Sequence, residues 1–398
     1  MISLDEINLL KKIIGNSFYI VSQDDFAKHF KIWESAFKSK YDKFKMAYSY
    51  KTNYLPILCK KNKELGGLAE VVSDIEYEIA SSVGVSYKEI VFNGPLKSTE
   101  LSANVIANGG IVNVDSYSEA KALVNILKER TIDGVKIGIR CNIPIDGKTS
   151  RFGIPIESKD FFDTVHLFNE NNIQIGCLHC HIKGRSEDAW RKKTEAMICT
   201  FDSISEFCSQ DCCIDLGGSL PALIDCDDAS AVAMCYAEVI AGSFRNRFNN
   251  DGPTLIVEPG TALAAPSMSF VTTAISSKTI NGESYITLSA SSQNIGSSHN
   301  RNPKYLTQIP YGCKSDKSIL CGYTCLEDDI ICDYDRSINI GDTLIFNYIG
   351  AYSIVLKPPF IMPNFPVLAF DNVEKRYKVV RKAQDLSSFC TCQELDNL

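Results

Sequence analysis

The sequence predicts an α/β fold: a (β/α)8 TIM-like barrel plus an all-β C-terminal domain that the N-terminal strand completes. Two patterns along the 398 residues indicate this fold. Between residues 45 and 260, short apolar runs alternate with longer amphipathic stretches, as buried parallel strands alternate with helices. After residue 262, apolar and polar residues alternate with a period of two. We expect the barrel to span residues 28–262, and residues 1–27 and 263–398 to form a β-sandwich or barrel-like domain.

The apolar runs match the strands of a closed barrel, a fold whose typical length is about 250 residues. Stretches such as 118–130 and 160–172 lie between the runs and have apolar residues three and four positions apart. An open doubly wound sheet is the alternative, but no Gly-x-Gly-x-x-Gly turn follows the first strand. The predicted strands are 45–50, 67–73, 89–94, 110–115, 135–140, 175–182, 213–218 and 254–260.

The β domain is predicted from a hairpin and several further strands. Asn281 and Gly282 separate two alternating runs within residues 267–291, and Asn-Gly at such a place is a strong hairpin signal. We expect the early run 18–23 to pair into the same domain. Further strand-like runs are 318–324, 342–349 and 377–382.

The composition argues against several classes of protein. The chain has 41 Lys and Arg against 48 Asp and Glu, whereas a nucleic-acid-binding protein usually presents a basic stripe. No apolar run reaches the roughly 18 residues of a membrane span. The N-terminal sequence MISLDEINLLKK lacks the apolar core and small-residue cleavage site of a signal peptide. We expect a cytoplasmic protein that binds neither nucleic acid nor membrane.

The 16 cysteines form no repeated framework, and we expect most of them to be buried thiols in a reducing compartment. Cys177, Cys180 and His181 have the spacing of a haem-attachment motif, but they lie in an apolar run that is typical of a buried strand. No second ligand pair stands at zinc-finger spacing. We predict no metal.

Catalytic residues of a barrel lie at the carboxyl ends of its strands. The last two predicted strands end in DLGGS (215–219) and EPGT (258–261), and glycine turns at these strands commonly bind phosphate through backbone N–H groups. Lys51 lies at the end of an apolar run, where a desolvated amine can perform Schiff-base chemistry. The polar residues at or just after the predicted strand ends are Lys51, Ser73, Glu76, Asn93, Asp115, Arg140, His181 and Glu258.

Together these motifs resemble the fold-type III pyridoxal-phosphate (PLP) decarboxylases, the group of diaminopimelate and ornithine decarboxylases. YSYKTN (48–53) is similar to the motif of the Schiff-base lysine, and LHCHIKG (178–184) to the motif whose second histidine stacks on the cofactor. The similarity runs in order over nearly the whole chain. The other matching segments are 71–80, 92–98, 137–155, 215–221, 258–261, 322–329 and 350–352.

The resemblance implies pyridoxal 5′-phosphate as cofactor and a homodimer with a shared active site. It implies that Lys51 holds the cofactor, that His181 stacks on its ring and that Glu258 binds the pyridine nitrogen. Cys325 would deliver a proton to Cα after decarboxylation. Further implied cofactor contacts are Arg140, Gly217, Gly218, Gly260 and Tyr352.

Departures from the family bear on the cofactor phosphate and on the substrate. Thr261 replaces the arginine that commonly follows Glu-Pro-Gly, and Lys183-Gly184 replaces the Gly-Ser that follows the stacking histidine. Leu326 replaces the glutamate with which diaminopimelate decarboxylases hold the distal amine. The remaining candidate substrate contacts are Glu327, Asp329 and Arg301.

These departures favour a secondary-metabolism decarboxylase, for example in antibiotic or siderophore biosynthesis. We expect its substrate to be an ornithine-, lysine- or diaminopimelate-like amino acid, or a carboxylated aminoalkyl group on a larger intermediate. One alternative is an amino-acid racemase on the same fold, although racemases pair an arginine, not a residue such as Glu258, with the pyridine nitrogen. A second is a non-enzymatic PLP-binding protein, although such proteins are single barrels.

Overall fold

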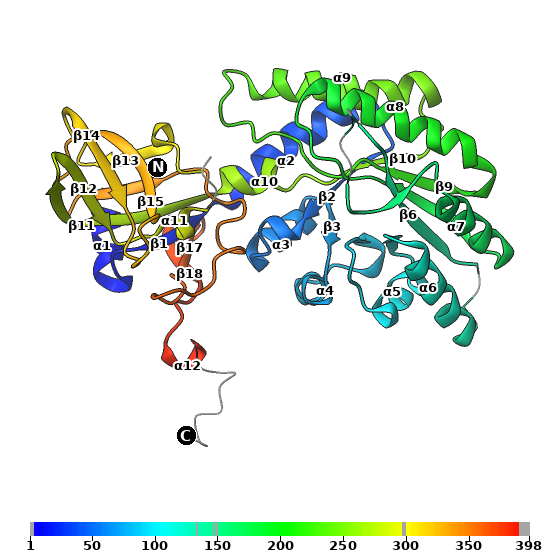
Figure 1. Cartoon of the computed structure of the whole chain (residues 1–398), viewed down its shortest axis with the longest axis horizontal. Helices are drawn as coiled ribbons and strands as arrows, with labels where there is room; N and C mark the ends of the chain where they lie inside the picture. Colours follow the sequence, from blue (N-terminus) through cyan, green and yellow to red (C-terminus); the bar gives the residue numbers. More distant parts are fainter. Residues whose placement is uncertain (1–3, 133, 146, 148–149, 297–299, 390–398) are drawn as a thin grey trace. The chain divides into compact units, whose positions relative to one another are not determined.

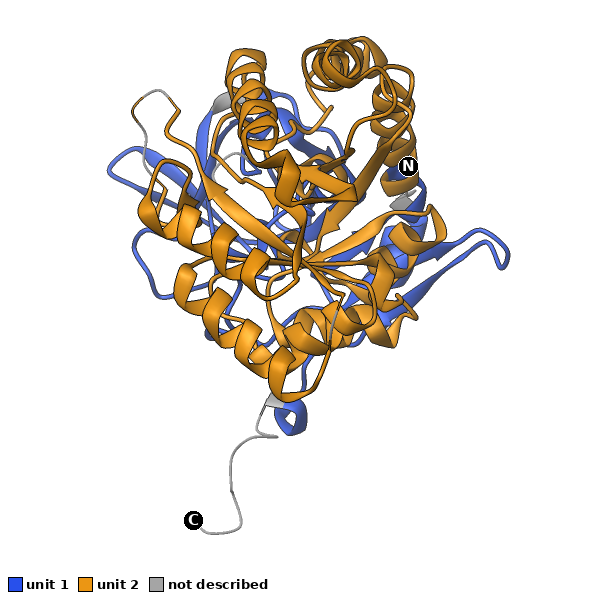
Figure 2. Cartoon of the chain, turned by 90° about the vertical axis from the view of Figure 1, so that its right-hand side faces the viewer, with its two compact units in different colours: residues 1–25, 264–398 blue, residues 26–263 orange. Residues whose placement is uncertain are grey.

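The computed structural model describes residues 4–389 except 133, 146, 148–149 and 297–299. Three positions of the predicted motif 137–155 therefore lie outside the described residues. The chain divides into two compact units, one of Phe26–Leu263 and one of Met1–Asp25 with Ala264–Leu398, coloured separately in Figure 2.

The unit Phe26–Leu263 is a closed barrel of eight parallel strands, which confirms the predicted fold class (Figure 1). The barrel strands are β2 (Phe44–Ser49), β3 (Leu68–Val71), β4 (Ile90–Phe92), β5 (Ile111–Val114), β6 (Lys136–Asn142), β8 (Gln174–His179), β9 (Cys208–Asp215) and β10 (Thr254–Val257). Each of these strands pairs with the next, and β10 pairs with β2 to close the ring. The two-residue strand β7 (Ile154–Pro155) adds to β6 outside the ring.

Helix α2 precedes the first barrel strand, the other helices of the barrel follow its strands, and serines mark where many of them begin. The helices are α2 (Gln23–Lys38), α3 (Pro56–Glu64), α4 (Asp74–Ser82), α5 (Thr99–Ala107), α6 (Tyr117–Glu129), α7 (Lys159–Glu170), α8 (Glu187–Ile204), α9 (Ala229–Phe248) and α10 (Thr261–Ala264). A serine hydroxyl accepts a backbone N–H of the first turn in α4 to α8, which satisfies a donor that the helix itself leaves unpaired. No helix of the described residues is long and apolar enough to cross a membrane.

The second unit is built on a nine-stranded sheet, as the predicted all-β domain requires. Its strands are β1 (Phe18–Val21), β11 (Met268–Ile280), β12 (Glu283–Leu288), β13 (Leu306–Ile309), β14 (Lys314–Cys321), β15 (Ile330–Arg336), β16 (Thr343–Phe346), β17 (Val367–Asp371) and β18 (Arg376–Arg381). Strand β1 lies between β11 and β17, so the N-terminal run completes this sheet as predicted. The Asn281-Gly282 hairpin is also confirmed, because Ile280 and Glu283 are paired on either side of the turn.

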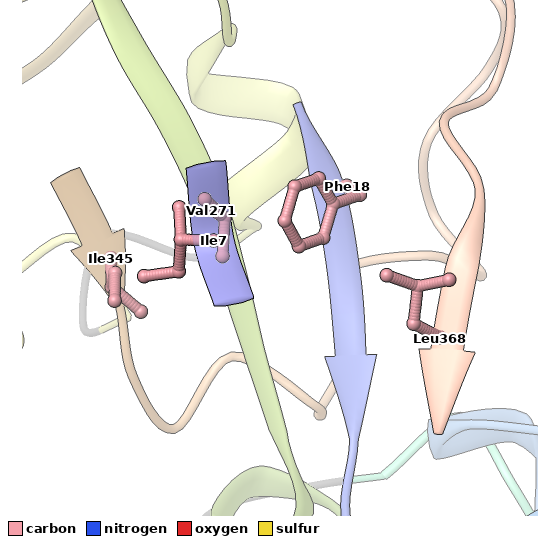
Figure 3. Packing of buried hydrophobic residues seen from close by; sticks show 5 residues of the cluster. All are labelled: Ile7, Phe18, Val271, Ile345 and Leu368. Carbon is pink, nitrogen blue, oxygen red and sulfur yellow. The ribbon is translucent and has the colours of Figure 1, made fainter. Parts of the chain in front are cut away.

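The sheet of this unit packs against the N-terminal helix α1 (Leu4–Ile14), which the sequence-based prediction did not include. Ile7 of α1 is fully buried against side chains of β1, β11, β16 and β17 (Figure 3). Burial of such an apolar side chain stabilises the fold by about 1.5–3 kcal/mol. The cluster consists of Ile7, Phe18, Val271, Ile345 and Leu368. Two short helices, α11 (Ser292–Ile295) and α12 (Leu386–Phe389), complete the unit.

Candidate active site

A cavity of about 690 Å³ lies at the carboxyl ends of the barrel strands. Five residues that the sequence predicted at strand ends line it: Lys51, Asn93, Arg140, His181 and Glu258. They come from distant parts of the chain, and the closed barrel brings them together because all its strands run in one direction. This is the end at which barrel enzymes carry their catalytic residues.

Lys51 lies in a short 3-10 helix (Tyr50–Thr52) that directly follows β2. Its Nζ forms an ion pair with Oε2 of Glu70 at 2.5 Å, and the Ser49 hydroxyl donates to the same oxygen. The Lys51 side chain is about one-third exposed, whereas that of Glu70 is 1% exposed. A buried carboxylate therefore holds the amine at the wall of the cavity.

Glu258 directly follows β10 and is fully buried at the floor of the site. Burial alone raises its pKa, but the neighbouring His179 and His181 and the charge of Lys51 outweigh burial and hold the pKa well below its ordinary value. The distances are 3.4 Å from His179 Nε2 to Oε1 and 3.9 Å from His181 Nδ1 to Oε2. Glu258 is therefore an anion inside the barrel.

Asn93 links the two buried carboxylates. Its side-chain amide donates to Glu258 Oε1 at 2.5 Å and to Glu70 Oε1 at 3.2 Å. Asn113, on the next strand, donates to the Asn93 side-chain oxygen at 2.8 Å and so fixes the orientation of that amide. The network spans four strands and satisfies polar groups that would be costly to bury alone.

Asp215 and His179 lie beside Glu258 and are also buried. Burial, followed by the charge of Glu258, raises the pKa of Asp215 well above its ordinary value, and burial lowers the pKa of His179. Ligand atoms of these three residues lie within 4.8 Å of one another, a spacing that could hold a metal ion. The absence of a metal stays a prediction.

The predicted phosphate turn follows β9. The Gly217 N–H donates to Asp215 Oδ1 at 2.8 Å, and the Gly218 N–H donates to His181 Nδ1 at 3.0 Å. Gly217 has a φ of +64°, and a Cβ there would collide with the carbonyl oxygen of Cys180. Only glycine fits this position without strain. The turn therefore brings backbone closer to His181 than a side chain would allow.

Two other predicted cofactor residues have defined surroundings in the barrel unit. Arg140 on β6 is nearly buried, and its guanidinium contacts Asp115 at 3.2 Å and lies 4.7 Å from the centre of the Phe152 ring. Gly260 lies so close to Thr52 that a Cβ there would collide with the threonine hydroxyl. Both positions are thus constrained by packing on neighbouring segments.

The remaining predicted residues belong to the other compact unit, so their roles stay predictions. Cys325 and Glu327 are exposed. Asp329 is buried and accepts hydrogen bonds from the Ser292 N–H at 2.7 Å and from the backbone and hydroxyl of Thr324. Its carboxylate therefore stabilises the 324–329 loop.

Arg301 and Tyr352 complete the set of predicted residues in that unit. The Arg301 guanidinium donates to the Ile330 carbonyl at 3.0 Å. Tyr352 is partly exposed and has a φ of +57°, a conformation that non-glycine residues adopt mostly at functional sites and tight turns.

The sequence-based prediction missed Glu70 and His179. It took Ser73 and Glu76 as the polar end of the second strand, but Ser73 caps α4 and Glu76 accepts the Val72 N–H at 2.8 Å. Glu70 stands inside the apolar run 67–73, and a carboxylate at such a place was the signal that could have identified it. His179 stands at the alternate position before His181 and lines the same cavity.

A model of the pyridoxal-dependent decarboxylase family, for its pyridoxal-binding domain, matches residues 23–265. The chain belongs to this family. Diaminopimelate decarboxylase of Aquifex aeolicus is 25% identical over 268 residues, which cover 64% of this chain and 61% of that enzyme. The enzyme of Methanocaldococcus jannaschii is 27% identical over 280 residues, 66% of this chain and 64% of the enzyme. The matched part is thus less than two-thirds of either relative's length.

The similarity in three dimensions extends further along the chain. The crystal structure of the M. jannaschii diaminopimelate decarboxylase in complex with L-lysine superposes with a TM-score of 0.85 at 20% identity. The superposition covers 98% of this chain and 94% of that one, so this decarboxylase shares the fold of the protein.

The barrel cavity fits the family's cofactor, pyridoxal phosphate. Oε2 of Glu258 is buried and forms no hydrogen bond within the part of the chain that the structure describes. A protonated ring nitrogen would satisfy this oxygen. Lys51 offers an amine in the same cavity, and Gly217 and Gly218 offer a turn without side chains for the phosphate.

Proposed function

We propose that this protein is a PLP-dependent carboxy-lyase that decarboxylates an amino acid or an aminoalkyl carboxylate. The proposal rests on one cavity that holds both the amine of Lys51 and the buried carboxylate of Glu258. Lys51 stands at its wall and Glu258 at its floor, with the glycine turn of Gly217 beside His181. This arrangement matches what a decarboxylase of this family needs from its barrel.

When bound, pyridoxal phosphate supplies an electron sink for the electron pair that loss of CO2 leaves at Cα. Lys51 would attach the cofactor through its amine, with Glu70 keeping that amine in place. Glu258 would hold a proton on the ring nitrogen, because its low pKa keeps it anionic. His181 would cover one face of the ring.

The later steps involve residues of the other unit. Cys325 would donate the proton to Cα, a task that a thiol can perform. A homodimer with a shared active site would supply this thiol from the partner subunit. Of the two candidate carboxylates, Glu327 and Asp329, we propose that Glu327 binds the distal amine of the substrate. Glu327 is exposed, whereas Asp329 accepts hydrogen bonds within its own loop. Arg301 is the proposed contact for a substrate carboxylate.

The proposed substrate is an ornithine-, lysine- or diaminopimelate-like amino acid, or a carboxylated aminoalkyl group of a larger intermediate. A role in antibiotic or siderophore biosynthesis in the cytoplasm accounts for the departure at Leu326. A diaminopimelate-like substrate is consistent with the relatives, which are diaminopimelate decarboxylases.

The test is CO2 release by the PLP-loaded protein from L- and D-forms of ornithine, lysine, arginine and diaminopimelate. Chiral analysis of the same samples detects racemisation. We expect CO2 release from at least one compound, and loss of release in Glu258→Ala with cofactor still bound. The control is Glu327→Gln, which should change KM for a diamino substrate more than it changes cofactor binding. Racemisation without CO2 release would contradict the proposal.

A further inference from the structure

Lys193, on helix α8, is a buried cation that the proposed mechanism does not use. Its exposed fraction is 2%, and no carboxylate of the described residues forms an ion pair with it. Its Nζ donates to the Leu216 carbonyl at 2.7 Å and lies 3.4 Å from the Gly218 carbonyl. The ammonium also sits 3.3 Å from the centre of the Trp190 ring.

A lysine in this position is costly, because burial removes the ammonium from water. Burial lowers the pKa of Lys193 to about 8, while the negative charge of Glu258 opposes that shift. The side chain therefore keeps most of its charge near neutral pH. Since its hydrogen-bond partners are carbonyl oxygens of the glycine turn, the charge acts directly on that turn.

The geometry of the turn shows what this contact does. In a trans peptide the C=O and the following N–H point in opposite directions. A Gly218 carbonyl that faces Lys193 therefore directs the N–H of Ser219 to the opposite side of the turn. That N–H forms no hydrogen bond within the described part of the chain.

Two conformations in the turn support the same interpretation. Gly217 has a φ of +64° and Ser219 a φ of +89°, and successive N–H groups in such turns form concave anion-binding sites. A φ of this kind is unfavourable for serine, so the surrounding contacts must hold it there. The Ser219 hydroxyl also reaches toward the Ile182 carbonyl, at 3.4 Å, on the segment that carries His181.

We propose that Lys193 is a positioning residue of the phosphate site: it holds the Leu216 and Gly218 carbonyls of the 215–219 turn on one side, so that the Ser219 N–H faces the phosphate dianion of the cofactor. Its charge behind the turn adds to the attraction. This inference rests on the proposed assignment of the turn to the cofactor phosphate.

The experiment compares binding of PLP and of pyridoxal, which lacks the phosphate, to the apo-protein. The variants are Lys193→Met, which removes charge and donors, and Lys193→Gln, which keeps donors without charge. The matched control is Lys192→Met, because Lys192 is the neighbouring lysine of α8 and pairs with Asp188 at the surface. Absorbance of the bound cofactor gives both dissociation constants.

We expect Lys193→Met to weaken PLP binding about 10- to 100-fold and pyridoxal binding less than about threefold, as for loss of a charge-assisted interaction. Lys193→Gln should lie between the wild type and Lys193→Met, and Lys192→Met should change neither constant. Equal losses for both ligands would show a purely structural role and overturn the proposal, as would no loss for either.

Lys193→Gln keeps the test usable if Lys193→Met does not fold, because it preserves the donors to Leu216 and Gly218. The wild type separates this proposal from the one on which it rests. If the wild-type protein binds pyridoxal as tightly as PLP, the assignment of the turn to the phosphate is wrong. If the wild type prefers PLP and Lys193→Gln keeps the full preference, only the role of Lys193 is wrong.

Discussion

Lys193 makes the stability of the barrel depend on pH in a way that one substitution should abolish. The pKa of Lys193 is about 8 in the folded protein against 10.5 in an exposed lysine, and burial is the main cause. At about 1.4 kcal/mol per pH unit, this difference corresponds to about 3 kcal/mol. Between these two values the unfolded chain binds more protons than the folded one, so stability rises with pH across that window. In Lys193→Met this increase in stability with pH should be absent.

The assay is urea unfolding of the apo-protein, followed by tryptophan fluorescence. It is repeated at several pH values from about 7 to about 10.5, a range that spans both pKa values. The chain has two tryptophans, Trp33 and Trp190, and both lie in the barrel unit, so the signal reports unfolding of that unit. Stability of the wild type relative to Lys193→Met should increase by about 3 kcal/mol over the range. Lys192→Met should follow the wild type. Parallel curves for the wild type and Lys193→Met would show that Lys193 is not the source of this pH dependence.

Three further substitutions test the site and the core. Gly217→Ala should destabilise the barrel by about 1–3 kcal/mol and prevent cofactor binding, since alanine is strained at a φ of +64°. Urea unfolding measures the loss of stability, and a cofactor titration measures the loss of binding. Asn93→Leu leaves Glu70 and Glu258 without a shared donor and should cost about 1–3 kcal/mol in urea unfolding. Phe18→Ala removes a buried ring from the second unit and should cost about 3–5 kcal/mol, seen as a lower urea midpoint by circular dichroism.

The barrel could be predicted from the sequence because its strands are buried on both faces. Such strands appear as short apolar runs, for example 254–260, and their alternation with amphipathic stretches indicates parallel strands joined by helices. The strand β1 could be predicted for the same reason. Helix α1 was not predicted, because a single apolar stripe with Ile7 on it does not tell which sheet it covers.

The site was predictable where a residue stands at a strand end and less so where it stands inside a strand. Lys51 and Glu258 follow apolar runs, so their place at the cavity follows from the fold class. Glu70 lies within β3, and its role depends on which face of the strand points into the barrel. The contact of Asn113 with Asn93 depends on the pairing of β4 and β5, which single-strand patterns do not specify.

Asp215 and Glu258 illustrate a distinction that only the three-dimensional contacts make. Both are fully buried carboxylates at the ends of adjacent strands, yet the pKa of Asp215 is raised by burial and by Glu258, while histidines lower the pKa of Glu258. One proton is therefore held on Asp215, and Glu258 keeps the negative charge that a protonated ring nitrogen needs.

It follows that Asp215→Asn leaves the charge of the site unchanged, whereas Glu258→Gln removes it. We expect Asp215→Asn to bind PLP with an absorbance spectrum close to that of the wild type, and Glu258→Gln to bind PLP with an altered spectrum and little CO2 release. The spectra are measured at equal cofactor occupancy. If Asp215→Asn had the larger effect of the two, the proton would reside on Glu258, and Asp215 would be the anion that faces the cofactor.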